Sequence, residues 1–102
     1  MKTKEKLLAR MGEYVEREEL DSEDLTTIAS HLLKTEDIDH VCYFGEVVTD
    51  KERKLHFWLI LEDTGEVIDF RKPKETHQYE GEETNRIVGN LATFIEIKNR
   101  LK

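Results

Sequence analysis

The chain has 102 residues, with 23 acidic and 16 basic side chains and a formal net charge of −7 at pH 7. A chain of this length buries roughly two-thirds of the surface that its unfolded form exposes, which is enough for a single domain with one core. The negative charge disfavours nucleic-acid backbones and anionic membranes as partners, because both would repel it. A basic protein is the partner that this charge favours.

Cysteine usage and hydropathy bear on the compartment. Cys42 is the only cysteine, so no disulfide can form within the chain, as is typical of a reducing compartment. No segment approaches the roughly 20 apolar residues that cross a bilayer, and no apolar signal core follows the basic N-terminus. We therefore expect a cytoplasmic protein.

Two amphipathic helices are predicted at the start of the chain. Apolar residues recur at spacings of three and four over residues 3–19. A second helix begins at Asp21 or Ser22, either of which can cap its first turn, and it ends near Lys34. Because almost nothing separates the two helices, we expect an antiparallel hairpin or a sharp corner.

The middle of the chain predicts strands. Residues 40–49 are rich in β-branched and aromatic side chains, and Gly45 weakens a helix there, which favours a strand. Their spacing also fits a short helix over 42–53, which stays as the alternative. Two apolar runs follow, at 55–61 and 66–70, and the acidic turn with a glycine between them predicts a β-hairpin.

The remaining residues predict a loop and a closing helix. Residues 71–83 are polar and contain the only proline, so we expect a flexible loop with one short strand near Gln78 and Tyr79. An apolar stripe over 84–101 predicts a helix, with a strand over 93–97 as the alternative. The sequence thus predicts one α+β domain with an N-terminal helical hairpin, a three-stranded antiparallel β-meander and a C-terminal helix.

One group of residues in this region matches the residue types of a known catalytic mechanism. A cysteine nucleophile needs an imidazole as its base and a third group that orients the imidazole. The chain offers Cys42, His56 and Asp69 in that order. With the hairpin turn near Asp63, His56 lies opposite about residue 71, one diagonal step from Asp69.

His56-Phe57-Trp58, followed after a short turn by residues 65–69, resembles the His-x-Trp…Asp hairpin of transglutaminase-like and papain-like thiol enzymes. The resemblance implies that His56 is the base, Asp69 its orienter and Cys42 the nucleophile. It departs at the cysteine, which begins a helix in those enzymes and here falls within a predicted strand. The structural interpretation is that Cys42 is a small buried hydrophobe and that His56 and Asp69 are ordinary sheet residues.

Other chemistry is poorly represented. The four histidines and the cysteine are spread along the chain, and only His40 and Cys42 are closely spaced, so we expect no metal site. The five glycines are isolated, so no phosphate-binding loop is predicted. We expect no cofactor.

Carboxylates are concentrated around the predicted junction of the first two helices. Helix capping and the helix dipole account for part of this acidic cluster, and a basic partner could use it as an electrostatic handle. It comprises Glu16, Glu18, Glu19, Asp21, Glu23 and Asp24. The loop residues Arg71, Lys72 and Lys74 have the opposite sign, so a homodimer is conceivable. Trp58 is either a core residue or an interface anchor.

These observations favour a small acidic protein-binding module over an enzyme. We expect an inhibitor, an immunity protein, an anti-defence protein or an adaptor, and a phage is a candidate source. A minimal thiol hydrolase that uses Cys42, His56 and Asp69 is the first alternative. An acidic mimic of nucleic acid is the second.

Overall fold

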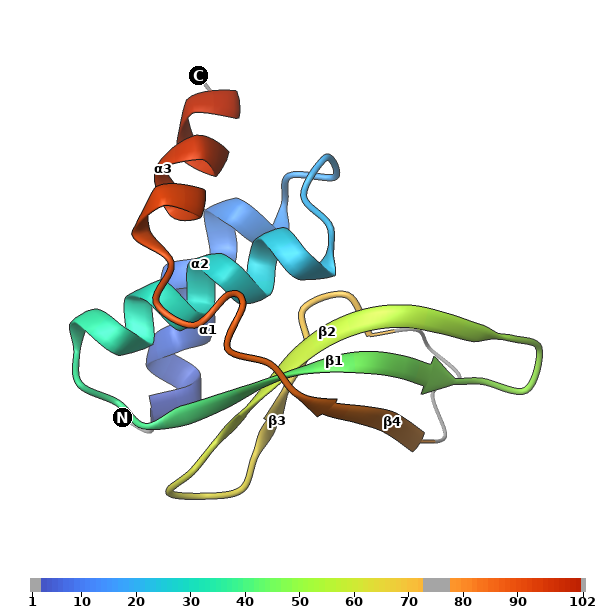
Figure 1. Cartoon of the computed structure of the whole chain (residues 1–102). Coiled ribbons are helices and arrows are strands. Elements are labelled where there is room, and N and C mark those ends of the chain that lie inside the picture. The colour runs from blue at the N-terminus through green and yellow to red at the C-terminus, as the bar shows by residue number, and fades with distance from the viewer. Residues whose placement is uncertain (1–2, 73–77, 102) are drawn as a thin grey trace.

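A computed structural model describes residues 3–72 and 78–101. Within them it contains three helices and one antiparallel sheet of four strands in the order β3-β2-β1-β4 (Figure 1). The elements are α1 (Thr3–Val15), α2 (Ser22–Thr35), β1 (His40–Val48), β2 (Arg53–Leu61), β3 (Val67–Ile68), β4 (Gln78–Glu83) and α3 (Leu91–Arg100). The predicted α+β class is confirmed, with four strands in place of three.

The helices differ from the prediction at their ends. The first helix stops at Val15, and two further turns bring Leu20 into the core, where its side chain is almost fully buried. The last helix begins at Leu91 and not at 84, because the Asn90 side chain caps it by accepting from the Thr93 amide at 3.1 Å. Thr84 instead continues along β1, and its amide donates to the Cys42 carbonyl at 2.8 Å.

The strand predicted over 40–49 is present as β1, so the helical alternative is wrong. It pairs with β2 through a short turn in which the Thr49 amide donates to the Glu52 carbonyl at 3.0 Å. The short strand expected near Gln78 and Tyr79 is present as β4, which extends further than expected and pairs with the other edge of β1. The loop prediction is therefore wrong over 80–83, and its residues 73–77 lie outside the described residues. Residues 80–83 carry no strand pattern, and pairing with β1 overrides their weak propensity.

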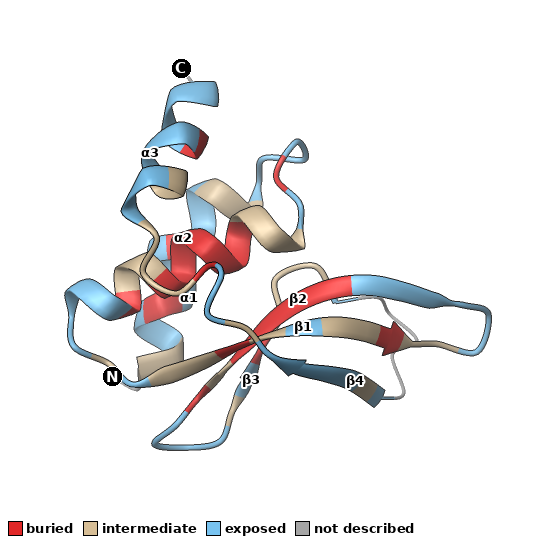
Figure 2. Ribbon diagram, in the orientation of Figure 1, coloured by how far each residue is buried: buried red, intermediate tan, exposed pale blue. Residues whose placement is uncertain are grey.

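Helix α2 is the centre of the core. It packs against β1 and β2 on one side and contacts both other helices (Figure 1). Alternate residues of β2, namely Phe57, Leu59 and Leu61, point toward it. Figure 2 shows that burial is concentrated where α2 crosses the hairpin, while β4 and the far part of the β1–β2 hairpin remain largely exposed.

The opposite face of the sheet is closed by aromatic rings. Trp58 is only 3% exposed, although its side chain points away from α2. Its ring stacks on Tyr43 and lies 4.8 Å from the Tyr79 ring, centroid to centroid. Gly45 and Gly81 are paired across β1 and β4, and a Cβ on Gly81 would lie 2.7 Å from the Trp58 ring. The glycines therefore make room for the indole.

Candidate functional site

A buried polar cluster joins three segments around His56. The Nε2 atom of His56 lies 2.7 Å from Oδ1 of Asp69, and the Tyr79 hydroxyl donates to Oδ2 of the same carboxylate at 3.0 Å. The Arg71 amide also donates to Oδ1 at 3.0 Å. The side chains of His56 and Asp69 are 8% and 2% exposed. This carboxylate is therefore fixed from three directions.

The register of the sheet explains why the sequence located this pair. Leu59 pairs with Ile68, and continuing that register places His56 opposite residue 71. That is the position predicted from the hairpin, and Asp69 lies one diagonal step away. The predicted proximity of His56 and Asp69 is confirmed.

The cluster has a defined proton arrangement. Because Asp69 is an acceptor, the neutral His56 ring carries its proton on Nε2 and keeps a lone pair on Nδ1. Burial, and then the charge and hydrogen bond of Asp69, raise the pKa of Tyr79 above its usual value. Tyr79 therefore stays a hydrogen-bond donor at neutral pH.

Cys42 does not join this cluster. It lies in the middle of β1 and points toward α2, whereas His56 points to the opposite face of the sheet. Burial raises the pKa of the Cys42 thiol to about 11, against a smaller lowering by a hydrogen bond with Ser30. The structure therefore does not assemble Cys42, His56 and Asp69 into a triad, because the alternation of side chains along β1 and β2 separates them.

A shallow pocket of about 370 Å³ opens beside His56, at the edge of β2. Ser22, the first residue of α2, lines it and accepts a hydrogen bond from the Phe57 amide at 3.2 Å. Arg71 closes another side, since its guanidinium donates to the carbonyls of Leu20 and Arg17. The sequence marked Ser22 only as a helix cap, and the cap itself is Asp21.

The hydrogen-bonded pair of Ser30 and His40 has a structural role. The Nδ1 atom of His40 donates to the Ile38 carbonyl at 2.9 Å, so Nε2 accepts from the Ser30 hydroxyl at 2.7 Å. Ser30 also accepts from the Gly89 amide and is fully buried. This pair ties α2 to β1 and to the segment before α3, and no substrate can reach its hydroxyl.

Half of the acidic cluster is paired with arginines. Glu19, Glu23 and Asp24 form ion pairs with Arg17, Arg86 and Arg100 respectively. The side chains of Asp21 and Asp24 form a capping box at the start of α2. Glu16 and Glu18 are exposed near this end of α1. The cluster is therefore a weaker electrostatic handle than its sequence indicates.

The other predicted contact residues are distributed differently. The guanidinium of Arg71 is engaged with backbone carbonyls, and Lys72 is exposed. Lys74 lies outside the described residues. Trp58 is buried between two tyrosines, so it belongs to the interior and offers no surface for a partner.

Half of one sheet face is left uncovered by the helices. We call it the open sheet face and define it by Phe44, Glu46, Leu55, Glu80 and Glu82, which line a wide depression of about 660 Å³. Leu55 is 73% exposed and Phe44 37%. Arg53 pairs with Glu80 at 2.5 Å and with Glu46 at 3.8 Å. The sequence did not single out this surface, because it depends on β4.

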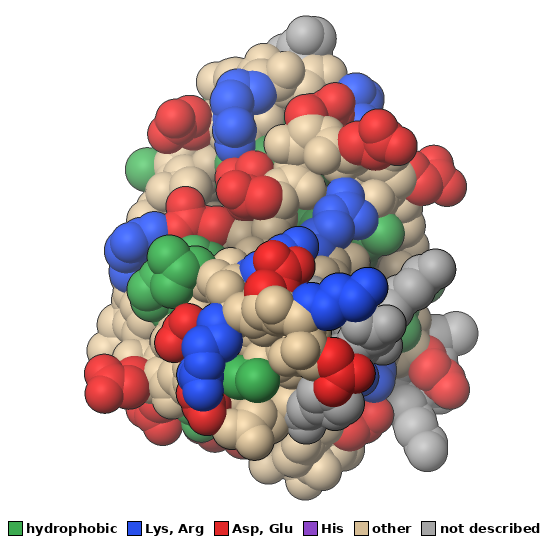
Figure 3. Space-filling view, turned by 90° about the vertical axis from the view of Figure 1, so that its right-hand side faces the viewer, with side chains coloured by type: hydrophobic (Ala, Val, Ile, Leu, Met, Phe, Trp, Pro, Cys, Tyr) green, Lys and Arg blue, Asp and Glu red, His purple; other side chains and the backbone are tan. Residues whose placement is uncertain are grey.

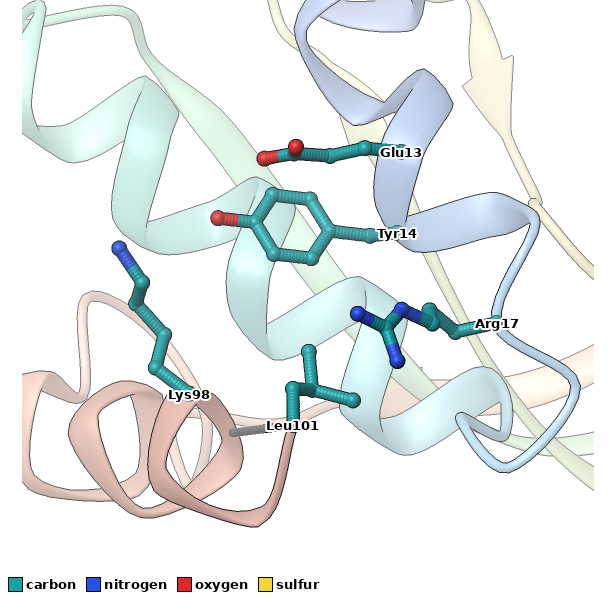
Figure 4. Close-up of a pocket in the computed structure, with 5 residues that line it drawn as sticks. All are labelled: Glu13, Tyr14, Arg17, Lys98 and Leu101. Atoms are coloured by element: carbon teal, nitrogen blue, oxygen red, sulfur yellow. The ribbon is translucent and has the colours of Figure 1, made fainter.

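A further pocket of about 190 Å³ lies between α1 and α3 and is lined by Glu13, Tyr14, Arg17, Lys98 and Leu101 (Figure 4). Its charged residues are all exposed, so it holds no buried polar group. Among the described residues, no group of three or more His, Cys, Asp or Glu side chains could hold a metal ion. None of the described helices is long and apolar enough to cross a bilayer.

Comparisons with known proteins identify no relative. The chain matches no protein-family model, and no curated protein or solved structure is significantly similar to it. The site must therefore be interpreted from its own geometry.

Proposed function

We propose that this protein binds a basic protein partner through the open sheet face. The observation that carries the proposal is the pair of exposed apolar side chains, Phe44 and Leu55, bordered by glutamates. Exposed apolar side chains within a polar rim are typical of interaction surfaces. The net charge of −7 adds long-range attraction for a basic partner.

The two apolar side chains are well placed as anchors. The Phe44 ring lies 4.5 Å from the Phe57 ring, centroid to centroid, so part of it is already supported by the core. Leu55, in β2, projects from the same face of the sheet as Phe44 and is the most exposed of the large apolar residues described. Complete burial of a leucine contributes roughly 1.5–3 kcal/mol, so contact with Leu55 would supply a useful part of an affinity.

The charges around the anchors favour a cationic partner. Glu46, Glu80 and Glu82 surround the apolar pair, and Arg53 offsets one of these charges. Figure 3 shows acidic and basic side chains interspersed at the end of the molecule to which the hairpin points. A mimic of nucleic acid needs a continuous row of carboxylates, and the face in view in Figure 3 mixes both signs of charge, which favours a basic protein for this surface.

The test combines capture with surface variants. Wild-type protein is immobilised and exposed to a lysate of its source cell, and bound proteins are quantified by mass spectrometry at low and high salt. We expect a basic partner whose capture falls with salt and is lost in Phe44→Ala/Leu55→Ala and in Glu80→Lys/Glu82→Lys. The matched controls are Val67→Ala, which changes an exposed apolar residue of β3, and Glu62→Lys in the β2–β3 turn.

Three outcomes would overturn the proposal. The first is that no protein is captured differently by the wild type and the open-face variants. The second is that the partner is a nucleic-acid-binding protein that free nucleic acid displaces, which indicates mimicry. The third is that the open-face variants abolish only self-association, measured by sedimentation, which would make a second copy of the chain the occupant.

A further inference from the structure

We propose that Ser22, His56 and Asp69 form an acyl-transfer site that hydrolyses small carboxylic esters. This activity goes beyond partner binding and uses the neighbouring pocket at the edge of β2, which shares Leu55 with the open sheet face. Ser22 is the nucleophile, His56 the general base and Asp69 the positioning residue. Three observations support this assignment: the state of His56, the place of Ser22 and the start of α2.

His56 is prepared to accept a proton from the pocket. Its Nε2 is held by Asp69, which leaves the lone pair on Nδ1, the nitrogen with no partner among the described residues. His56 also lines the pocket at the edge of β2, so we place the lone pair of Nδ1 there.

Ser22 supplies the hydroxyl in the same pocket. Its Oγ accepts from the Phe57 amide at 3.2 Å, which holds the hydroxyl at the edge of β2, in the pocket that His56 also lines. Because Oγ acts as the acceptor in that bond, its own proton is free to be donated. The structure shows no hydrogen bond between Ser22 and His56, and catalytic contacts of this kind commonly tighten only when substrate is bound.

The start of α2 supplies stabilisation for a negative oxygen. The first turn of a helix leaves amide groups without intrahelical acceptors, and these carry the positive end of the helix dipole. The Asp21 carboxylate accepts a hydrogen bond from the Asp24 amide. The amides of Ser22 and Glu23 are left without an intrahelical acceptor. They are the candidates for an oxyanion-binding site.

The reaction proceeds in two steps, acylation of Ser22 and hydrolysis of the acyl group. Oγ of Ser22 bonds to the ester carbonyl carbon while its proton passes to Nδ1 of His56, and the carbonyl oxygen takes up the negative charge. The intermediate collapses by breaking the bond to the alcohol, which leaves with the proton from His56. Water then attacks the acyl group on Ser22 with the same proton transfers, giving the carboxylic acid and the free hydroxyl.

The size of the pocket suits short acyl groups. Its volume of about 370 Å³ is at the lower end of small-molecule sites. Leu55 provides its exposed apolar side chain, while Glu18, Asp21, Lys54 and Arg71 balance in charge. A neutral ester with a short acyl chain matches this lining, so p-nitrophenyl acetate is the probe for turnover.

The decisive experiment is covalent labelling with a fluorophosphonate, followed by peptide mapping. The chain has only two serines, and the fully buried Ser30 is the internal comparator. We expect an adduct on Ser22 and none on Ser30. Ser22→Ala should lower p-nitrophenyl acetate turnover about 100-fold or more. Asp69→Asn should lower it similarly near neutral pH and displace the pH–rate profile, which a purely structural role would leave unchanged.

A second variant keeps the test independent of how Ser22→Ala folds. In Ser22→Cys the new thiol should react with iodoacetamide at pH 7 faster than a free cysteine does, because His56 stabilises a thiolate. Cys42 does not interfere, since it is buried and its pKa is raised to about 11. The proposal is overturned if folded wild type takes no label at Ser22, or if Ser22→Ala hydrolyses the ester as fast as the wild type.

Discussion

Replacing Gly45 by alanine tests the packing of β1 against β4. A Cβ at this position would lie 2.1 Å from the Glu80 carbonyl oxygen and 2.3 Å from the Gly81 Cα. Both are backbone atoms, so no side-chain rotation relieves the clash, and the strands must separate locally. Overpacking costs typically 1–3 kcal/mol, and each backbone hydrogen bond lost adds about 1 kcal/mol. We therefore expect Gly45→Ala to lower the free energy of unfolding by about 3 kcal/mol.

Gly12→Ala is the matched control. Gly12 lies within α1, and a Cβ there would meet no atom within 4 Å. Alanine is favoured over glycine inside a helix by about 1 kcal/mol, so this variant should be more stable than wild type. Urea unfolding followed by circular dichroism and Trp58 fluorescence measures both changes. An unfolding free energy for Gly45→Ala equal to or above that of wild type would refute the packing described for β1 and β4.

Three further predictions concern single groups. Asp21→Ala should lower the unfolding free energy in urea by about 1 kcal/mol, because it removes the capping box of α2. Tyr79→Phe should lower it by roughly 1.5–3 kcal/mol at pH 7, since Asp69 loses a donor. The Cys42 thiol should resist iodoacetamide in the folded protein. Burial raises its pKa from 9.0 to about 11, so the native state prefers the protonated thiol. This preference contributes roughly 3 kcal/mol to the free energy of unfolding below pH 9, and the contribution is lost as the pH rises toward 11. The midpoint of urea unfolding, measured against pH, reports the loss.

Each of these has an outcome that contradicts it. Asp21→Ala is compared with Asp63→Ala in the β2–β3 turn, and an equal loss in both would show that the cap has no special role. Unchanged stability in Tyr79→Phe would mean that the bond to Asp69 contributes nothing. Rapid alkylation of Cys42 in the folded protein would place its sulfur at the surface.

Local patterns were sufficient for much of the fold. The helices follow from apolar spacing, and the β2–β3 hairpin follows from two apolar runs around a glycine turn. The proximity of His56 and Asp69 could be predicted because a hairpin register depends on nearby residues alone. The fold class was correct for the same reason.

The remaining features depend on contacts between distant segments. The short strand expected near Gln78 and Tyr79 is present, but its extension through polar residues to Glu83 depends on pairing with β1, which no local pattern reveals. Ser22 meets the Phe57 amide only after α2 docks on the sheet. The thiol-hydrolase alternative included Cys42 because of its order in the sequence before His56 and Asp69. That order carries no information about the face of the strand on which Cys42 lies.

The topology of β4 has a consequence for the order in which the protein opens and folds. β1 and β2 are joined by a short turn, whereas β4 pairs with β1 only after the chain has passed from β3 at the opposite edge of the sheet. Closing such a long loop is slow and entropically costly. We therefore expect β4 to join the sheet after the β1–β2 hairpin has formed. Its amides should exchange with solvent deuterium earlier than those of β2, through local openings that leave the helical core intact.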